Sequence, residues 1–195
     1  MQHLITPYDS KIEPFAWWEG AFTLEELDWL RKIALSAETV AQVGGDPSQE
    51  DLTKIRRSTI SWMEKNQENF WVFEKLAHVV SALNSQFFKF ELTGFAEKLQ
   101  LTNYDEANKG MYGWHQDFGK PISSSRKMSV VVQLSDPDTY DGGELQLLTS
   151  GEPTTIKKER GFICLFPSYT LHQVTPVTWG NRQSLVTWVS GPPFK

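Results

Sequence analysis

Apolar residues recur at helical spacing in the first half of the chain. They fall three or four positions apart between residues 23 and 36, and again between residues 68 and 86. This period buries one face of a helix against the rest of a protein. Thr23 and Glu26 also stand at the spacing of a capping box, in which the two side chains satisfy backbone amides at a helix start. The pattern therefore predicts two helices, over residues 23–36 and 68–86.

From about residue 90 onward the pattern shortens to strand-length runs rich in β-branched and aromatic residues. Turn-forming segments such as Asn108-Lys109-Gly110 and Asp141-Gly142-Gly143 separate these runs. We predict strands near residues 90–93, 97–104, 111–116, 127–134, 144–148, 153–157, 161–166, 171–177 and 182–190. Because no helices intervene between these strands, a doubly wound α/β sheet is disfavoured, and a sandwich or jelly roll packed on helices is favoured.

The predicted fold class is therefore α+β, mainly β. The length of 195 residues suits one domain, and no internal repeat or linker divides the chain. We place a single domain over residues 1–195, with helical support over about residues 20–88 and a jelly-roll core over about residues 90–192.

Composition excludes several classes of function. With 19 Lys and Arg against 24 Asp and Glu, the formal charge is −5 and neither sign forms a long block, so no nucleic-acid partner is expected. Cys164, the lone cysteine, lies in an apolar run and is predicted to be a buried thiol. No apolar run approaches the ~18 residues that indicate a membrane span. We therefore expect a cytoplasmic protein with no membrane partner, and the sequence carries no signal of its oligomeric state.

Two histidines and an aspartate form a candidate metal site. His115 and Asp117 are two residues apart on a predicted strand, so both side chains project from one face. His172 lies on a distant predicted strand and could complete a face of two histidines and one carboxylate, which leaves the opposite coordination positions open. Taken alone, the His-x-Asp pair fits a surface or hydrogen-bonded pair better.

Arg182 is a candidate anchor for a carboxylate. It follows ten residues after His172, beyond a predicted hairpin turn at residues 178–181. Its planar guanidinium can bind a carboxylate with two parallel hydrogen bonds, and the hydroxyl of Ser184 could add a third. Taken alone, Arg182 fits a surface salt bridge better.

Together these positions carry a family resemblance. The order His115-x-Asp117, then His172 after 54 intervening residues and Arg182 ten further on, resembles the iron(II)- and 2-oxoglutarate-dependent dioxygenases, specifically their prolyl 4-hydroxylase-like branch. The positions that agree with it are Tyr104, Gly142-Gly143-Glu144-Leu145, Phe166-Pro167-Ser168 and Trp188. Residues 171–177 also look like the bacterial PKHD-type hydroxylases. The resemblance runs from about Leu99 to Pro192, with a weaker one over residues 55–62.

This resemblance implies a fold, a metal and two cosubstrates. The fold is the double-stranded β-helix, a jelly roll whose mouth holds the metal. The ligands of Fe(II) would be His115, Asp117 and His172. The cosubstrates would be 2-oxoglutarate and O2, with ascorbate as a further cofactor. Arg182 would pair with the distal carboxylate of 2-oxoglutarate and Tyr104 would donate a hydrogen bond to it, while Leu145 and Ser184 would line the same pocket.

The resemblance also implies a reaction, the hydroxylation of an unactivated C–H bond with release of succinate and CO2. The expected substrate is a prolyl residue in a peptide or protein. The residues that would face the reacting centre or contact this substrate are Tyr112, Trp188, Arg57 and Trp62. Loops over residues 40–53 and 117–127 flank the expected mouth and could close over it.

One departure leaves the substrate open. Prolyl 4-hydroxylases of the collagen type carry lysine where this chain has Arg182, so the anchor is nearer that of the oxygen-sensing and PKHD-type hydroxylases. A free amino acid, another protein side chain or a small metabolite therefore stay as alternative substrates.

Two other classes of function stay open on the sequence. A non-catalytic jelly-roll module could bind carbohydrate or peptide, although the intact set of candidate ligands and Arg182 argues against a decayed site. A cupin-type metal isomerase or hydrolase would also use a jelly roll, but such enzymes usually employ more histidines and have no reason for an arginine at this offset.

Overall fold

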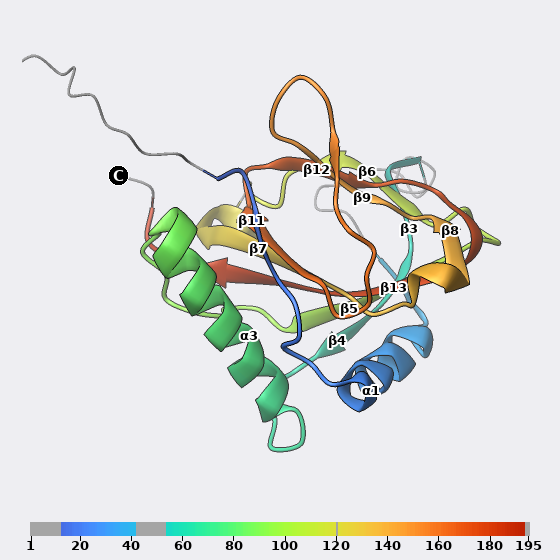
Figure 1. Cartoon of the computed structure of the whole chain (residues 1–195), viewed down its shortest axis with the longest axis horizontal. Helices are drawn as coiled ribbons and strands as arrows, with labels where there is room; N and C mark the ends of the chain where they lie inside the picture. The colour runs from blue at the N-terminus through green and yellow to red at the C-terminus, as the bar shows by residue number, and fades with distance from the viewer. Residues whose placement is uncertain (1–12, 42–53, 120, 194–195) are drawn as a thin grey trace, which may run out of the picture.

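Two α-helices lie along one side of the molecule (Figure 1). The structure, a computed structural model, describes residues 13–41, 54–119 and 121–193. The helices are α1 (Leu24–Leu35) and α3 (Phe70–Leu83), and α3 continues into a π-helical turn over Asn84–Phe88. Both helices predicted from the apolar period are confirmed.

The capping box at the start of α1 is also confirmed. The Thr23 hydroxyl accepts a hydrogen bond from the backbone N–H of Glu26 at 3.3 Å, and the Glu26 carboxylate accepts one from the backbone N–H of Thr23 at 2.8 Å. The same carboxylate binds Nζ of Lys75 in α3 at 2.7 Å. Glu26, the second residue of the capping box, therefore also links α1 to α3.

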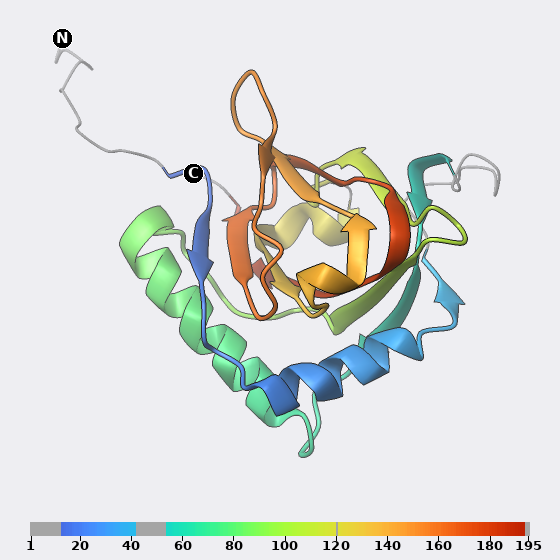
Figure 2. The same ribbon diagram turned by 45° about the vertical axis from the view of Figure 1, so that its right-hand side comes forward.

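The described strands pair antiparallel and form two sheets, which curve towards each other as a jelly roll (Figure 2). The larger sheet has the order β1 (Ala16–Trp18), β11 (Ile163–Pro167), β7 (Arg126–Gln133), β13 (Val177–Ser190), β5 (Leu99–Asp105), β4 (Thr59–Met63) and β2 (Thr39–Val40), with β8 (Tyr140–Gly142) paired to β13. The smaller sheet has the order β10 (Thr154–Thr155), β9 (Leu145–Leu148), β12 (Leu171–Val174), β6 (Met111–His115) and β3 (Arg56–Arg57).

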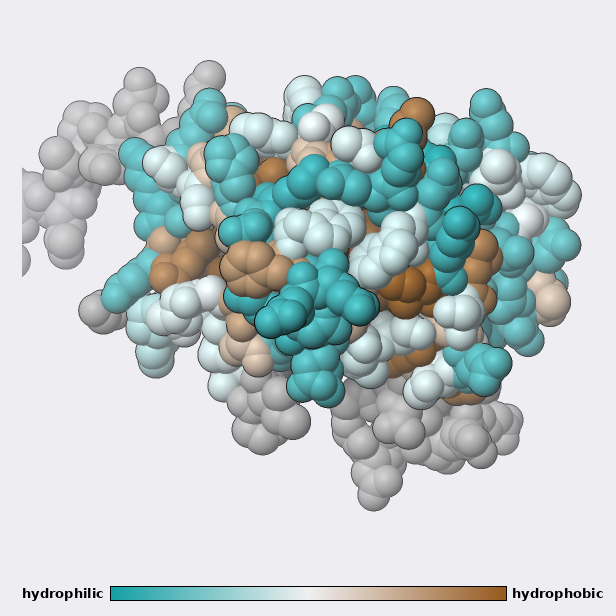
Figure 3. All heavy atoms as spheres, turned by 90° about the horizontal axis from the view of Figure 1, so that it is seen from below, coloured by the Kyte–Doolittle hydropathy of each residue, from teal (hydrophilic) through white to brown (hydrophobic). Residues whose placement is uncertain are grey.

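The larger sheet is covered on both faces, because successive side chains of a strand point to opposite sides. On its outer face, Leu185 belongs to the same apolar core as Leu30 of α1 and Leu76 of α3. On its inner face, Val131 packs with Leu145 of the smaller sheet. The side that carries the helices presents hydrophilic residues mixed with smaller hydrophobic patches (Figure 3). The helices thus cover the outer face of the larger sheet, and its inner face lies against the smaller sheet.

Several predictions in the strand region differ from the structure; the strand predicted over residues 171–177, for example, ends at Val174. No strand forms over residues 90–93, because the Asn84 side chain brackets Phe90, accepting from its N–H at 3.0 Å and donating to its carbonyl at 2.9 Å. The strand predicted over residues 153–157 is only β10, of two residues. The hairpin turn predicted at residues 178–181 does not form, because β13 runs unbroken and its first residues pair with β8.

The predicted helical support over residues 20–88 also contains strands β2, β3 and β4. These short segments pair with strands far along the sequence; β4, for example, pairs with β5 from Thr59 opposite Asn103 to Met63 opposite Leu99. Because these strands are short and their partners are distant in sequence, the local order of apolar and polar residues does not reveal them. Residues 20–88 therefore contribute strands to both sheets as well as the two helices: β2 and β4 to the larger sheet and β3 to the smaller one.

Other expectations fall in loops and at single residues. Of the predicted loop over residues 40–53, residues 42–53 lie outside the described residues. Pro121–Ser125, within the loop predicted over residues 117–127, form a 3-10 helix. Cys164 is buried as predicted, and burial raises the pKa of its thiol. Across the described ranges, no helix has both the length and the apolar character needed to cross a membrane.

Candidate metal centre

His115, Asp117 and His172 come together between the sheets. His115 ends β6 and lies opposite His172 of β12, while Asp117 follows two residues after β6. Nε2 of His172 lies 3.4 Å from Oδ2 of Asp117, and Nε2 of His115 lies 3.7 Å from Oδ1. One donor atom from each residue fits within a 4.8 Å cluster. Two imidazoles and a carboxylate at this spacing can hold one metal ion.

Both imidazoles are oriented by their second nitrogen. Nδ1 of His115 lies 2.7 Å from the Gly113 carbonyl oxygen, and Nδ1 of His172 lies 2.9 Å from that of Thr170. A proton on each Nδ1 donates to the carbonyl, which leaves the lone pair on Nε2 beside Asp117. Burial and the neighbouring His172 lower the pKa of His115 to about 3. His115 is therefore neutral at pH 7, as a metal ligand must be.

The Asp117 carboxyl is held in its ionised form. Burial raises its pKa, but the two imidazoles and the hydroxyl of Ser129 together bring the pKa of Asp117 below its usual value. Ser129, on β7, donates to Oδ2 of Asp117 at 2.7 Å, and its Oγ lies 3.1 Å from Oγ of Ser168. The larger sheet therefore orients the carboxylate that joins the two histidines of the smaller sheet.

Aromatic rings enclose the histidines. The Tyr112 ring stacks on His115 with centroids 3.4 Å apart, and Phe166 meets His172 edge-on at 4.8 Å. Burial raises the pKa of Tyr112 to about 12, so its hydroxyl stays protonated at neutral pH. The Arg56 guanidinium lies 4.6 Å from the centre of the Tyr112 ring. The wall behind the histidines is therefore apolar and aromatic.

Arg182 lies on the inner face of β13 with unused hydrogen-bond donors. The residue is 1% exposed, and its Nη2 donates to Oε1 of Gln133 at 2.9 Å. Its guanidinium carbon lies 5.4 Å from the centre of the Tyr104 ring. Nε and Nη1 are buried without a hydrogen-bond partner in the part of the chain that the structure describes. A buried cation with two open donors is costly unless a ligand satisfies it.

The other residues predicted for this pocket, Ser184 and Leu145, are both buried. Ser184 is buried and is paired with Thr102 on β5 and with Gln133 on β7. Leu145 is buried in the apolar cluster between the sheets. The inner wall is therefore polar around Arg182 and apolar opposite it.

The predicted substrate residues are only partly brought together. Trp188 pairs with Ser129 across β13 and β7, and its ring lies 6.4 Å from that of Trp62, which is 46% exposed. Arg57 turns towards the loop after β5, where its Nε donates to the Asn108 carbonyl at 2.7 Å. Its neighbour Arg56 is the arginine that covers Tyr112. Arg56 and Arg57 are adjacent on β3, so their side chains point to opposite faces of the strand, and Arg56 is the one that contacts Tyr112.

Sequence reasoning missed Ser129 and Gln133, which contact Asp117 and Arg182. Both stand on β7 four residues apart, and the strand period of two puts them on one face. Apolar residues fill most of the positions between them. Two buried polar residues on one face of an apolar strand were the signal that could have identified them.

Tyr140 was also missed; burial raises the pKa of its hydroxyl, and the nearby Arg182 guanidinium counteracts the rise.

A family comparison agrees with this arrangement. The model of the family described as the 2OG-Fe(II) oxygenase superfamily matches residues 99–190, which include every residue of the cluster and Arg182. Over these residues, slightly less than half of the chain, the sequence is similar to this superfamily.

Curated proteins similar to this chain include PKHD-type hydroxylases. One from Teredinibacter turnerae is 39% identical over 87 residues, which cover 42% of this chain and 38% of that protein. One from Synechococcus sp. (strain CC9605) is 43% identical over 79 residues, which cover 40% of this chain and 36% of that protein. The match thus spans well under half the length of these relatives.

Solved structures show the same fold across nearly the whole chain. A prolyl hydroxylase from Trichoplax adhaerens, in complex with a hypoxia inducible factor peptide fragment, has a TM-score of 0.74 at 17% identity and covers 91% of this chain and 84% of its own. A prolyl-4-hydroxylase from Pseudomonas putida has a TM-score of 0.69 at 20% identity and covers 92% and 93%. The predicted jelly roll with N-terminal helices is confirmed.

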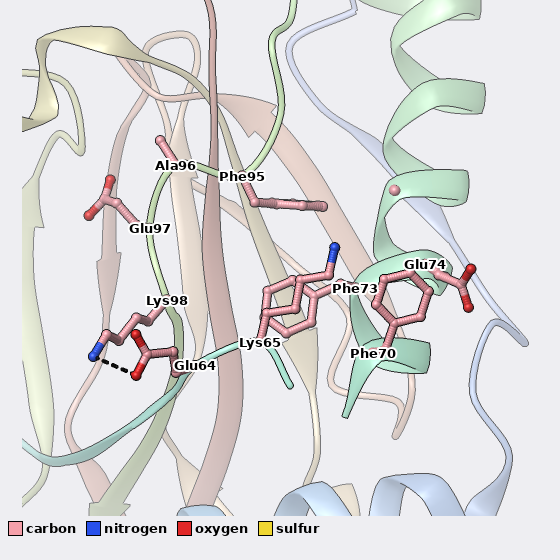
Figure 4. Close-up of a pocket in the computed structure, with 10 residues that line it drawn as sticks. Glu64, Lys65, Phe70, Phe73, Glu74, Phe95, Ala96, Glu97 and Lys98 are labelled. Carbon is pink, nitrogen blue, oxygen red and sulfur yellow. Dashed lines mark hydrogen bonds and ion pairs between the residues drawn. The ribbon is translucent and has the colours of Figure 1, made fainter. Parts of the chain in front are cut away.

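A cavity of about 580 Å³, which has none of the three cluster residues in its lining, lies where residues 64–65 and 95–98 face the start of α3 (Figure 4). Its wall contains Phe70, Phe73 and Phe95, and Nζ of Lys65 lies 4.4 Å from the centre of the Phe70 ring. It contains no histidine. The cavity therefore lacks the combination of two histidines and one carboxylate that His115, Asp117 and His172 form.

Proposed function

We propose that the chain is an Fe(II)- and 2-oxoglutarate-dependent dioxygenase that hydroxylates an unactivated C–H bond and releases succinate and CO2. One observation carries the proposal. The inner space of the jelly roll brings a cluster of two histidines and one aspartate together with a buried arginine that has unused donors. A site that only bound metal would have no use for such an arginine.

The residues present fit Fe(II). Two histidines and one carboxylate on one face of the metal leave coordination positions open for a chelating cosubstrate and O2. His115 is neutral and Asp117 ionised at neutral pH, so neither must change its charge to bind the ion. Fe(II), when bound, supplies the O2 chemistry that decarboxylates 2-oxoglutarate and oxidises the substrate. The protein supplies the position of the reactants and the exclusion of water.

Arg182 fits the distal carboxylate of 2-oxoglutarate. Among the described residues, Nε and Nη1 are buried donors without a partner, so the guanidinium keeps charge-assisted hydrogen bonds to offer a carboxylate. Gln133 holds Nη2 and so fixes the plane of the guanidinium. We assign the Tyr104 hydroxyl as a further donor to this carboxylate, and Ser184 and Leu145 as walls of the same pocket. This clamp orients the cosubstrate towards the metal.

We propose a prolyl residue in a peptide or protein as the substrate, with a free amino acid, another side chain or a small metabolite as the alternatives. The support is the fold shared with prolyl hydroxylases, one of which is in complex with a peptide fragment. Tyr112 and Trp188 would face the reacting carbon, and Trp62, whose exposed ring lies near Trp188, would contact the substrate. We propose Arg56 rather than Arg57 as the arginine beside it, since Arg56 covers Tyr112. Ascorbate stays a prediction.

Incubation with Fe(II), 2-oxoglutarate, ascorbate and air tests the substrate class. We expect succinate formation to rise with proline-containing peptides, and mass spectrometry to locate one added oxygen atom on a prolyl residue. Matched peptides with alanine for proline, and the His172→Ala variant with the original peptides, should give no such product. Hydroxylation of the alanine peptides or of free amino acids alone would overturn the prolyl assignment.

A further inference from the structure

Arg126, the first residue of β7, connects three parts of the site that were not linked by the sequence. Its Nη1 donates to the backbone carbonyl of Asp117 at 3.2 Å. The flat face of its guanidinium lies 3.7 Å from the centre of the Trp188 ring. Its two remaining nitrogens bind Glu97, with Nε to Oε1 at 2.6 Å and Nη2 to Oε2 at 2.5 Å. Every nitrogen of the guanidinium therefore has a partner.

Asp117 needs such support because it lies beyond the end of β6. A residue inside a strand is held by ladder hydrogen bonds on both sides, whereas Asp117 depends on separate contacts. Its N–H donates to the Ser168 carbonyl at 2.9 Å and its carboxylate accepts from Ser129. The bond from Arg126 is the contact to its carbonyl. The backbone of the proposed ligand is thus fixed at both its amide and its carbonyl.

Glu97 fixes the direction of the Arg126 side chain. The pair is bidentate, and its side chains are only 14% and 21% exposed, so solvent screens it less than a surface pair. Glu97 comes from the segment before β5 and also lines the cavity beside α3 (Figure 4). Because Glu97 binds both Nε and Nη2 of the planar guanidinium, the direction of Nη1 towards the Asp117 carbonyl is fixed.

We propose that Arg126, oriented by Glu97, is a positioning residue that holds the metal ligand Asp117 and the ring of Trp188 in the geometry the reaction needs. The inference rests on the proposed function, since it takes Asp117 as a ligand. Arg126 acts through these two residues and need not touch metal or cosubstrate. Partners of metal ligands are typically worth about 10–100-fold in affinity.

Cobalt(II) titration of the whole chain tests this role without turnover, because Co(II) takes similar ligands and its visible spectrum reports coordination geometry. We expect Arg126→Met to weaken Co(II) binding about 10-fold or more and to change the spectrum. Arg126→Lys should behave similarly, because lysine keeps the charge but cannot form the fork. Glu97→Gln should show a smaller loss in the same direction. The double variant should be no weaker than Arg126→Met alone, since Glu97 acts through Arg126.

Arg160→Met is the matched control. Arg160 also joins a carboxylate, that of Asp28, to a backbone carbonyl, that of Leu134, but it lies beside α1. It should leave Co(II) affinity and spectrum unchanged. Thermal unfolding of each apo-protein checks folding, and if Arg126→Met does not fold, Arg126→Lys and Glu97→Gln decide the question.

The outcomes separate the two proposals. Wild-type affinity and spectrum in folded Arg126→Lys and Glu97→Gln would overturn the positioning role and leave the proposed function intact. A wild-type chain that binds no Co(II), or a His172→Ala variant that binds it normally, would overturn the proposed function and with it this inference.

Discussion

An Asp117→Ala variant is expected to bind Fe(II) about 100-fold more weakly or worse, and to lose 2-oxoglutarate turnover. Asp117 is the anionic member of the cluster, and both histidines direct Nε2 at its carboxylate. Because partners of metal ligands alone are worth about 10–100-fold, loss of a ligand should cost more. Anaerobic Fe(II) titration measures the affinity, and succinate formation measures the turnover.

Asp28→Ala is the matched control for Asp117→Ala. Asp28 is half exposed and pairs with Arg160 near α1, so its loss should leave both measurements unchanged. Thermal unfolding should show that both variants fold. A folded Asp117→Ala chain with wild-type Fe(II) affinity would remove Asp117 from the ligand set.

An Arg182→Met variant is expected to bind 2-oxoglutarate about 100-fold more weakly, which corresponds to ~3 kcal/mol. The same change should raise the free energy of unfolding of the apo-protein by about 1 kcal/mol. The reason is that two nitrogens of the buried guanidinium have no hydrogen-bond partner in the described structure, so its desolvation outweighs its contacts with Gln133 and Tyr140. When a residue serves ligand binding at a cost in stability, its replacement weakens binding and increases the free energy of unfolding.

Isothermal titration with 2-oxoglutarate and denaturant unfolding measure the two effects of Arg182→Met. Arg182→Lys serves as the comparison, since it keeps the charge but loses the fork, and should recover only part of the affinity. If Arg182 were a structural cation, its loss would cost several kcal/mol of stability and leave cosubstrate affinity unchanged. That result would contradict the assignment of Arg182 as the carboxylate anchor.

The helices and the metal cluster were predictable for local reasons. The period of three and four residues marks the buried faces of α1 and α3, and the capping box is readable from Thr23 and Glu26 alone. His115 and Asp117 share a short segment. His172 was a candidate third ligand from its place on a distant predicted strand, and the family resemblance supported that choice. The cross-strand pairing of His172 with His115 brings the two histidines together in the fold.

The supporting residues were not predictable in the same way, because they depend on which strands become neighbours. Gln133 meets Arg182 only because β7 and β13 pair, and Arg126 meets Glu97 only because the start of β7 lies beside the segment before β5. The sequence analysis named Arg57 as a substrate contact, whereas the arginine that lies over Tyr112 is its neighbour Arg56. A shift of one residue moves a strand side chain to the opposite face, and composition cannot distinguish two adjacent arginines.

Anaerobic titration of Fe(II) into the apo-protein in the presence of 2-oxoglutarate tests the central claim most directly. Chelation of iron by the 2-oxo acid gives a visible charge-transfer band, so one spectrum reports the metal and the cosubstrate in the same site. We expect a band that saturates in the wild-type chain and is lost in His172→Ala. A folded wild-type chain that gives no band would contradict the dioxygenase proposal and favour a jelly-roll binding module.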